Sequence, residues 1–247
     1  MGVNYYLEAL PSSMKENKHQ ISIIIPVLNE EDYIRKVLEA IRENATSKNI
    51  KEVLVIDGGS TDCTVKEALD VGVQVVSAAK GRAKQMNKGA QMATGDLLYF
   101  LHVDTLPPKG FDTHILNTFS KGFEAGCFKL KFDSPNKFLR FFAWCTRINH
   151  QICRGGDQSL YISKNLFQKA GGFNEAYTVY EDNEFIQRIY RLTRFAIMPG
   201  TVQTSVRRYE QRGVFTLQYH FGVVHAKHYL GAGPADLYNY YKTHISL

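Results

Sequence analysis

The first hundred residues alternate between short apolar runs and segments whose apolar residues recur every three or four positions. The apolar runs are rich in β-branched residues, which is typical of buried strands. They are Ile21–Leu28, Glu52–Ile56, Val73–Val76 and the run that ends at Asp104. Helices are predicted between them, opening at 29–31, over 65–69 and over 81–93. Such alternation predicts an α/β fold, with a mostly parallel sheet and helices on both faces.

The pattern changes after residue 105, where strands and helices no longer alternate regularly. Strands are predicted at 126–132 and within 154–162, and helices at 138–152, 166–170 and 181–192. The chain from Gly213 on is aromatic and mostly helical, whereas residues 1–20 are polar and aperiodic and are expected to form a flexible tail. Because no linker interrupts the rest, 21–247 is predicted to be a single domain with a helical C-terminus.

Composition narrows the class of protein. The chain has 247 residues, 44% of them hydrophobic, which suffices for a sizeable core. The net charge of +6 suits phosphate-bearing ligands or an anionic membrane surface, but the basic residues are scattered, so nucleic-acid binding is not expected. Four cysteines without a C-x-x-C pair argue against zinc and are expected as reduced thiols in a cytoplasmic protein. Neither a signal peptide nor a membrane span is predicted.

Two predicted strands end on an aspartate, Asp57 and Asp104. Ligands of open α/β sheets bind outside the carboxyl ends of the strands, so both carboxylates are expected in a ligand site. A carboxylate there can hold a divalent cation against a diphosphate. The pair therefore indicates a nucleotide-diphosphate site. The alternative for Asp57, which precedes Gly58-Gly59, is a turn, and Asp62 is expected to cap a helix.

Two further candidates lie where helices are predicted to begin. Arg82 opposes the dipole of its helix unless an anion or carboxylate is near, and a ligand contact is predicted for it. Asp182 follows Glu181 at the start of a strongly periodic helix. There it could act as a general base toward an acceptor hydroxyl, or it could simply favour the helix N-terminus, as acidic residues do.

Polar residues elsewhere add weaker candidates. Asp157 and Gln158 follow two glycines, which permit close approach of the backbone to a ligand. The two residues could bind acceptor or donor hydroxyls or form a turn. Arg207 could neutralise a phosphate or lie on the surface. His102 stands two residues before Asp104 and is expected on the same side of the strand, where it could touch a phosphate or the cation.

An aromatic stretch raises the question of a membrane. The segment 137–144 has an amphipathic pattern that could lie in a bilayer interface. Its aromatic residues are Phe138, Phe141, Phe142 and Trp144. Because such residues more often line a core or an acceptor pocket, that interpretation is favoured, and peripheral membrane contact is the less favoured alternative.

Taken in order, the motifs resemble those of family-2 glycosyltransferases with a GT-A fold. The similarity covers about residues 21–209, and five motifs in register make it specific. They are Ile23–Glu31, Val55–Asp62, Gly81–Asp96, His102-Val-Asp104 in the DxD position and Glu181-Asp182 in the ED position. Within the family, the chain is most similar to a small subgroup of radical-SAM/selenodomain-associated transferases.

The resemblance implies roles for these residues. Residues 21–105 would form a nucleotide-binding half and 106–247 an acceptor-binding half. Asp57 and Arg82 would contact the base of a UDP- or GDP-linked sugar, and Glu30 its nucleoside. Asp104 would hold Mg²⁺ or Mn²⁺ on the diphosphate, and Asp182 would be the base in an inverting transfer to a small-molecule or lipid-linked acceptor.

The chain departs from the family pattern at two points. His102 replaces the first acidic residue of DxD, and Arg207-Arg-Tyr209 stands roughly where processive members carry Q-x-x-R-W. Transfer of a single sugar is therefore expected. Two alternatives stay open. A nucleotidyltransferase is disfavoured because the segment 26–30 is not a glycine-rich basic loop, and a non-catalytic nucleotide-binding scaffold is compatible with His102.

Overall fold

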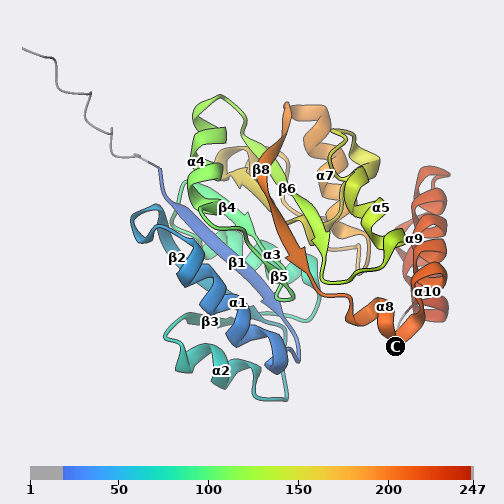
Figure 1. Ribbon diagram of the computed structural model, residues 1–247, viewed down its shortest axis with the longest axis horizontal. Helices are drawn as coiled ribbons and strands as arrows, with labels where there is room; N and C mark the ends of the chain where they lie inside the picture. Colours follow the sequence, from blue (N-terminus) through green and yellow to red (C-terminus); the bar gives the residue numbers. More distant parts are fainter. Residues whose placement is uncertain (1–18, 246–247) are drawn as a thin grey trace, which may run out of the picture.

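A computed structural model of the protein describes residues 19–245, in which the strands form one eight-stranded sheet (Figure 1). The order across the sheet is β3-β2-β1-β4-β7-β6-β8-β5. The strands are Ile21–Val27 (β1), Ile50–Asp57 (β2), Gln74–Ser77 (β3), Leu97–Phe100 (β4), Thr105–Leu106 (β5), Ala125–Phe132 (β6), Leu160–Ser163 (β7) and Phe195–Thr204 (β8). The predicted α/β fold with a mostly parallel sheet is confirmed, because β1 to β4 pair in parallel, as do β6 and β8.

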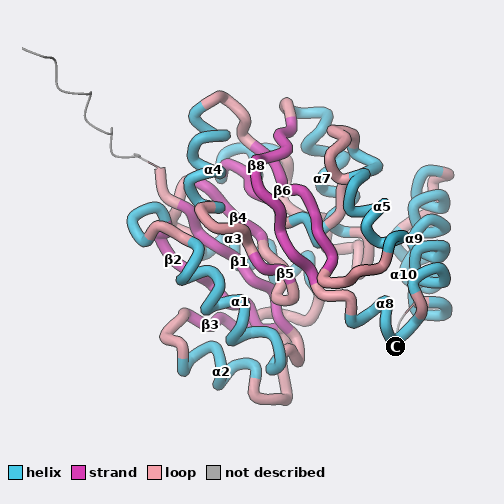
Figure 2. The backbone as a smooth tube through the Cα atoms, viewed as in Figure 1, coloured by secondary structure: helices cyan, strands magenta, loops and turns pink. Residues whose placement is uncertain are grey.

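Helices cover both faces of the sheet (Figure 2). They are Glu31–Asn44 (α1), Thr64–Asp70 (α2), Arg82–Met92 (α3), Phe111–Ser120 (α4), Lys137–Cys145 (α5), Lys164–Lys169 (α6), Glu181–Leu192 (α7), Arg207–Arg212 (α8), Val214–Tyr229 (α9) and Pro234–His244 (α10). The apolar faces of α1, α2 and α4 pack on one side, and those of α3, α6 and α7 on the other. In β1, alternate residues serve the two cores: Ile23 and Ile25 face the first and Ile24 the second.

The C-terminal helices have a core of their own. Leu139 of α5, Leu217 and Val224 of α9 and Leu237 of α10 are buried together beside the end of β6. Burial of this apolar surface holds the α9–α10 pair at the side of the domain away from α2 and β3 (Figure 1). No helix in residues 19–245 is long and apolar enough to cross a membrane.

Strand direction brings distant parts of the chain to one edge of the sheet. β7 is antiparallel to β4, and Phe100, the last residue of β4, pairs with Leu160, the first of β7. β6 is antiparallel to β7, and β8 is parallel to β6. The carboxyl ends of β1, β2, β4 and β8 and the start of β7 therefore lie at the same edge. We call it the carboxyl edge.

The fold differs from the sequence-based expectation in several elements. β4 ends at Phe100, and the segment to Asp104 turns, with the backbone N–H of Thr105 donating to His102 O at 3.1 Å. The helix predicted to reach residue 152 stops at Cys145, because the Thr146 hydroxyl donates to Ala143 O and accepts from the backbone N–H of Leu130. Both side-chain contacts compete with continued helix.

Elements that went unpredicted include the helix α4 and the strand β8. Helix α4 has an apolar face at Phe111, Ile115 and Leu116, although its sequence mixes in polar residues. β8 carries Pro199 and Gly200, which read as a turn, yet they lie at an irregularity between β6 and β8, where such residues are tolerated. The predicted tail at residues 1–20 lies almost wholly outside the described residues.

Candidate active site

The first group at the carboxyl edge joins the ends of β1 and β8. The Arg207 guanidinium lies 2.7 Å from each carboxylate oxygen of Glu30 and 3.9 Å from the nearer oxygen of Asp104. Its guanidinium carbon lies 4.4 Å from the centroid of the Tyr33 ring. The Glu30 pair is forked, the geometry in which arginine binds carboxylates and phosphates best. Sequence reasoning named Glu30, Asp104 and Arg207 separately, and the structure brings them together.

Asp57 ends β2 and is 5% exposed. Its carboxylate accepts hydrogen bonds from the backbone N–H groups of Gly59 and Ser60, at 3.1 and 3.0 Å. The turn that the sequence offered as an alternative is therefore formed. An ionised carboxylate can accept roughly four hydrogen bonds, so the turn leaves Asp57 able to accept a further one from a nucleotide base. That contact stays a prediction.

Helix α3 is fixed tightly enough to aim Arg82 at the edge. Gly89 packs so closely on β1 that a Cβ atom there would lie 2.4 Å from Ile24 Cγ2. The buried Gln85 side chain donates to Val27 O and Ile56 O, both at 2.8 Å. These contacts tie the first turns of α3 to the ends of β1 and β2.

Arg82 meets the acidic start of α7. Its guanidinium lies 3.3 Å from Glu181 Oε1 and 3.8 Å from Asp182 Oδ2. The two carboxylates offset the unfavourable interaction of the Arg82 cation with the dipole of α3. At the N-terminus of α7 the same carboxylates interact favourably with the dipole of their own helix. Arg82 thus has the nearby carboxylate that the sequence analysis named as one of two possibilities.

His102 lies between two carboxylates and is buried. Its Nδ1 is 3.3 Å from Asp157 Oδ1, and its Nε2 is 3.6 Å from Asp182 Oδ2. Burial and the Arg82 charge lower the pKa of His102, but the hydrogen bond that its ring donates to Asp157 and the charges of Asp182 and Asp157 outweigh them and raise it above its ordinary value. The imidazole thus links Asp182, Asp157 and the DxD segment.

Gly156 makes this contact possible. A Cβ atom there would lie 2.0 Å from Asp182 Oδ2 and 2.5 Å from His102 Cε1. The sequence analysis assigned the glycines before Asp157 to close approach by a ligand, whereas Gly156 admits the close approach of two side chains. In the sequence, only the pair of glycines between Arg154 and Asp157 indicated that a side chain would not fit at residue 156.

Glu181 is the most buried carboxyl of the site, at 2% exposure. Burial and the adjacent Asp182 charge raise its pKa to about 7, although Arg82 opposes the shift. Sequence reasoning placed Glu181 in the ED motif without a site role. Its burial could not be read from the sequence, because acidic residues in a first helical turn are usually exposed.

Three residues with positive φ flank the site. Among the described residues other than glycine, Asn29 (φ 54°), Ser159 (φ 59°) and Tyr180 (φ 71°) have this conformation. Each adjoins or lies within two residues of a site position: Asn29 precedes Glu30 and Tyr180 precedes Glu181. Strained backbone of this kind is held only where its surroundings over-determine it. For Tyr180 the constraint comes from α9, because the tyrosine hydroxyl lies 2.8 Å from His225 Nδ1.

Gln158 does not face the edge. Its Oε1 accepts from Arg154 at 2.7 Å, and its Nε2 donates to Cys153 O at 2.7 Å. Arg154 is itself buried and donates to the carbonyls of Thr146 and Ile148. The amide of Gln158 is thus already hydrogen-bonded within the protein. The prediction that Gln158 binds the donor or acceptor is therefore corrected. Gln158 instead supports the loop that carries Asp157.

The fit of a divalent cation rests on Asp104. No group of three or more His, Cys, Asp or Glu side chains within residues 19–245 is arranged to hold a metal alone. Mg²⁺, however, is usually bound by one or two carboxylates together with substrate phosphates and water. The partly exposed Asp104 carboxylate fits that mode. It opens on a cavity of about 160 Å³ lined by Tyr33, Lys36, Val103, Asp104, Leu106, Asp133, Gln203, Thr204 and Ser205.

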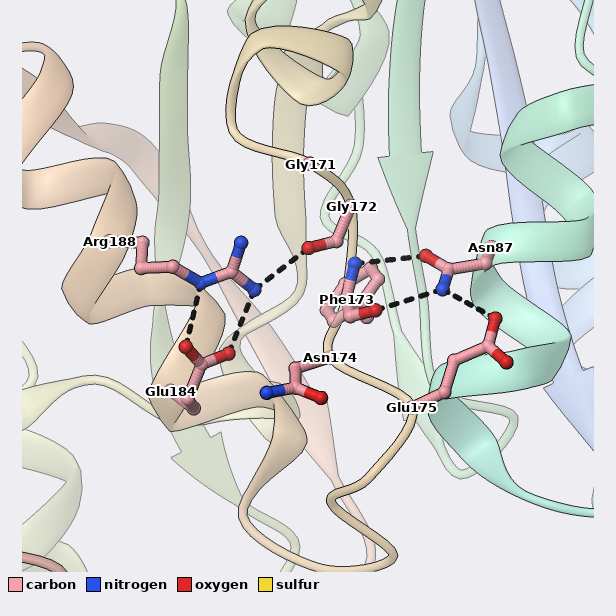
Figure 3. Close-up of a pocket in the computed structure, with 8 residues that line it drawn as sticks. All are labelled: Asn87, Gly171, Gly172, Phe173, Asn174, Glu175, Glu184 and Arg188. Atoms are coloured by element: carbon pink, nitrogen blue, oxygen red, sulfur yellow. Dashed lines mark hydrogen bonds and ion pairs between the residues drawn. The ribbon is translucent and has the colours of Figure 1, made fainter.

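A larger polar cavity of about 500 Å³ lies further along α3 and α7 (Figure 3). Asn87 and Arg188 reach into it from the two helices and hold the intervening loop. Asn87 accepts from Phe173 N and donates to Phe173 O, both at 2.9 Å, and Arg188 donates to Gly172 O at 2.7 Å. None of the predicted site residues lines this cavity. Its polar groups clamp the segment that leads into α7.

Comparison with known proteins supplies the family. A model of glycosyl transferase family 2 matches residues 22–180. The probable glycosyltransferase YdaM of Bacillus subtilis is 24% identical over 198 residues, which is 70% of this chain and 47% of that protein. The chain thus spans about half the length of this relative, and 32% and 31% of the length of two others.

Solved structures show the same fold. A mannosyltransferase from Pyrobaculum calidifontis, in complex with GDP-Man and Mn²⁺, is 20% identical with a TM-score of 0.64, over 90% of this chain and 68% of that one. Glucosyl-3-phosphoglycerate synthase from Mycobacterium tuberculosis, in complex with phosphoglyceric acid, is 18% identical with a TM-score of 0.58, over 77% and 71%.

Substitution of Gly156 tests the packing around His102. In Gly156→Ala the new methyl group should push Asp182 and His102 apart, and the pKa of His102 should fall toward its ordinary value near 6.5. An NMR titration of the histidine ring protons measures this. Gly155→Ala is the matched control, because a Cβ atom there has no atom within 4 Å. Equal His102 titrations in the two variants would contradict the packing described here.

The buried Glu181 carboxyl predicts a pH dependence of stability. A carboxyl whose pKa is about 7 when folded and 4.5 when unfolded contributes stability below pH 4.5 that is lost as the pH rises through 7. A shift of this size corresponds to at most ~3 kcal/mol. Glu181→Gln should therefore lose less free energy of unfolding than wild type between pH 5 and pH 8.

Urea unfolding at several pH values measures this difference. Glu210→Gln, an exposed change in α8, should leave the wild-type pH profile unchanged. The burial argument fails if Glu181→Gln follows the same profile as wild type.

Proposed function

Because this chain belongs to glycosyl transferase family 2, we propose that it moves a single sugar from a nucleotide-diphosphate sugar to an acceptor hydroxyl, with inversion at the anomeric carbon and with a divalent cation. The acceptor oxygen forms a bond to the anomeric carbon while the bond to the diphosphate oxygen breaks. The hydroxyl proton passes to the Asp182 carboxylate, and the nucleoside diphosphate leaves.

One observation supports Asp182 as the base above all others. Its carboxylate is the point where α3, α7, the DxD segment and the loop before β7 meet, with Arg82 and His102 both within 3.8 Å. The side chain is 13% exposed, so it is held by neighbours and still open to a substrate. A general base must combine such positioning with access to the proton that it removes. The neighbouring Glu184 is instead paired with Arg188 at 2.7 Å.

The donor would lie across the ends of β1, β2 and β4. Asp57 and Arg82 would contact the base and Glu30 the nucleoside, while Arg207 and Asp157 would contact phosphate and sugar groups. Asp104 would hold Mg²⁺ or Mn²⁺, which would neutralise the departing diphosphate. Support for this metal comes from the complex of the Pyrobaculum mannosyltransferase with GDP-Man and Mn²⁺, a protein with the same fold.

The identity of the acceptor stays open between a small molecule and a lipid-linked hydroxyl. Glucosyl-3-phosphoglycerate synthase, a protein of the same fold, was solved with phosphoglyceric acid, which favours small polar acceptors as the first to test. A cytoplasmic location and the narrower resemblance to radical-SAM/selenodomain-associated transferases remain predictions. The family match disfavours a nucleotidyltransferase.

The central test is removal of the proposed base. Asp182→Asn keeps the size of the side chain and loses its basicity. It should lower the release of nucleoside diphosphate from UDP-glucose or GDP-mannose by about 10²–10⁴-fold, the usual contribution of a general base. Release is measured with Mn²⁺ present, both with water and with phosphoglycerate as the acceptor.

Asp236→Asn is the matched control, since it makes the same change in the first turn of α10, on an exposed residue. It should keep wild-type turnover. Turnover by Asp182→Asn within a few-fold of wild type would remove Asp182 from the role of base. Wild-type protein that binds UDP or GDP but never turns over a sugar donor would instead favour the scaffold alternative.

A further inference from the structure

Aromatic rings form a continuous row between α5 and α9, which lie side by side (Figure 1). Phe138 connects the two helices, because its ring centroid is 4.5 Å from that of Phe215 and 4.9 Å from that of Phe142. Phe142 contacts Phe141 at 5.6 Å, and Phe141 stacks with Trp144 at 6.5 Å. The row therefore extends from the start of α9 along the length of α5.

The outer members of this row are exposed. The exposed fractions are 57% for Phe141, 56% for Trp144 and 69% for Phe215, and Tyr219, one helical turn beyond Phe215, is 67% exposed. The sequence analysis favoured a core or an acceptor pocket for Phe141 and Trp144, and their exposure rules out the core. We call Phe141, Trp144, Phe215 and Tyr219 the aromatic face. Contiguous exposed apolar surface of this kind usually marks an interaction site.

The two chain segments that carry the aromatic face contain basic residues and no acidic ones. Between Asp133 and Asp157 the chain has no acidic residue, and there is none from residue 211 to 235. Lys137, Arg140 and Arg147 are exposed on and just after α5. An apolar patch whose own segments carry cations and no carboxylates is complementary to a surface that is apolar below and anionic above.

We propose that the aromatic face binds the surface of an anionic lipid bilayer. Exposed Phe, Trp and Tyr side chains enter the headgroup region, where amphipathic rings are favoured, and the lysine and arginines meet anionic headgroups. Neither helix spans the bilayer. The charge pattern favours lipid over a second copy of this chain, because two copies meeting at this face would bring Lys137 and Arg140 of each toward like charges. This inference goes beyond the proposed function and does not depend on it.

Vesicle flotation tests the proposal with the full chain. Wild type should float with phosphatidylcholine vesicles that contain 30% phosphatidylglycerol, more weakly at 0.5 M NaCl, and more weakly still with pure phosphatidylcholine. Phe141→Ser/Trp144→Ser should lose at least tenfold in partitioning. Lys137→Gln/Arg140→Gln should lose roughly tenfold on anionic vesicles and little on neutral ones.

Leu69→Ser/Met92→Ser is the matched control, since it removes two exposed apolar side chains from α2 and α3, away from the aromatic face. It should float as wild type does, and equal melting temperatures establish that all variants are folded. Wild type that stays in the soluble fraction, or a Phe141→Ser/Trp144→Ser variant that floats unchanged, overturns the proposal. So does light scattering that shows a dimer broken by this variant in a protein that never floats, because the occupant would then be a second copy.

Discussion

The contact of Arg82 and His102 with the acidic start of α7 is the interaction on which the site depends. Glu181 and Asp182 are adjacent carboxyls at a largely buried position, and like charges there repel unless cations lie close. Arg82 comes from the first part of the chain and the carboxyls from a part about 100 residues later, so the contact also joins distant parts of the chain. The sheet makes this possible, because β7 reverses beside β4 and returns the later chain to the same edge.

Support for this contact extends outward in both directions. On the α3 side, Gly89 and Gln85 seat the helix on β1 and β2, and Asn87 fastens it to the loop before α7. On the α7 side, Tyr180 is held in a positive-φ conformation by His225 of α9. The C-terminal helices therefore also stabilise the start of α7. They brace the residue that precedes Glu181, and α9 contributes Phe215 and Tyr219 to the aromatic face.

Much of this could be predicted from the sequence, and the limits have physical causes. Elements with strong periodicity, such as β1, α1 and α7, were predicted because local pattern and tertiary burial agree. Asp104, Arg82 and Asp182 were named as candidates because they stand at predicted element ends or in family motifs. Gln158 was misassigned because it also stands in a polar turn, and its partner Arg154 is buried by contacts that no local pattern reveals. The pairing of Glu30 with Arg207 depends on β8, which places Arg207 at the same edge. This strand was not predicted because Pro199 and Gly200 within it are typical of turns.

Binding of a nucleotide through Asp104 tests the account most directly. Thermal unfolding is followed with UDP or GDP, with and without Mn²⁺, in wild type, Asp104→Ala and the control Asp96→Ala, which changes a carboxylate at the opposite end of β4. At roughly 100 times the Kd, one nucleotide should raise the Tm of wild type and of the control by about 5–10 °C. That rise should require Mn²⁺ and be lost in Asp104→Ala. No rise with either nucleotide, or a rise unaffected by Mn²⁺ and by Asp104→Ala, would contradict a metal-bound nucleotide-diphosphate donor at this edge.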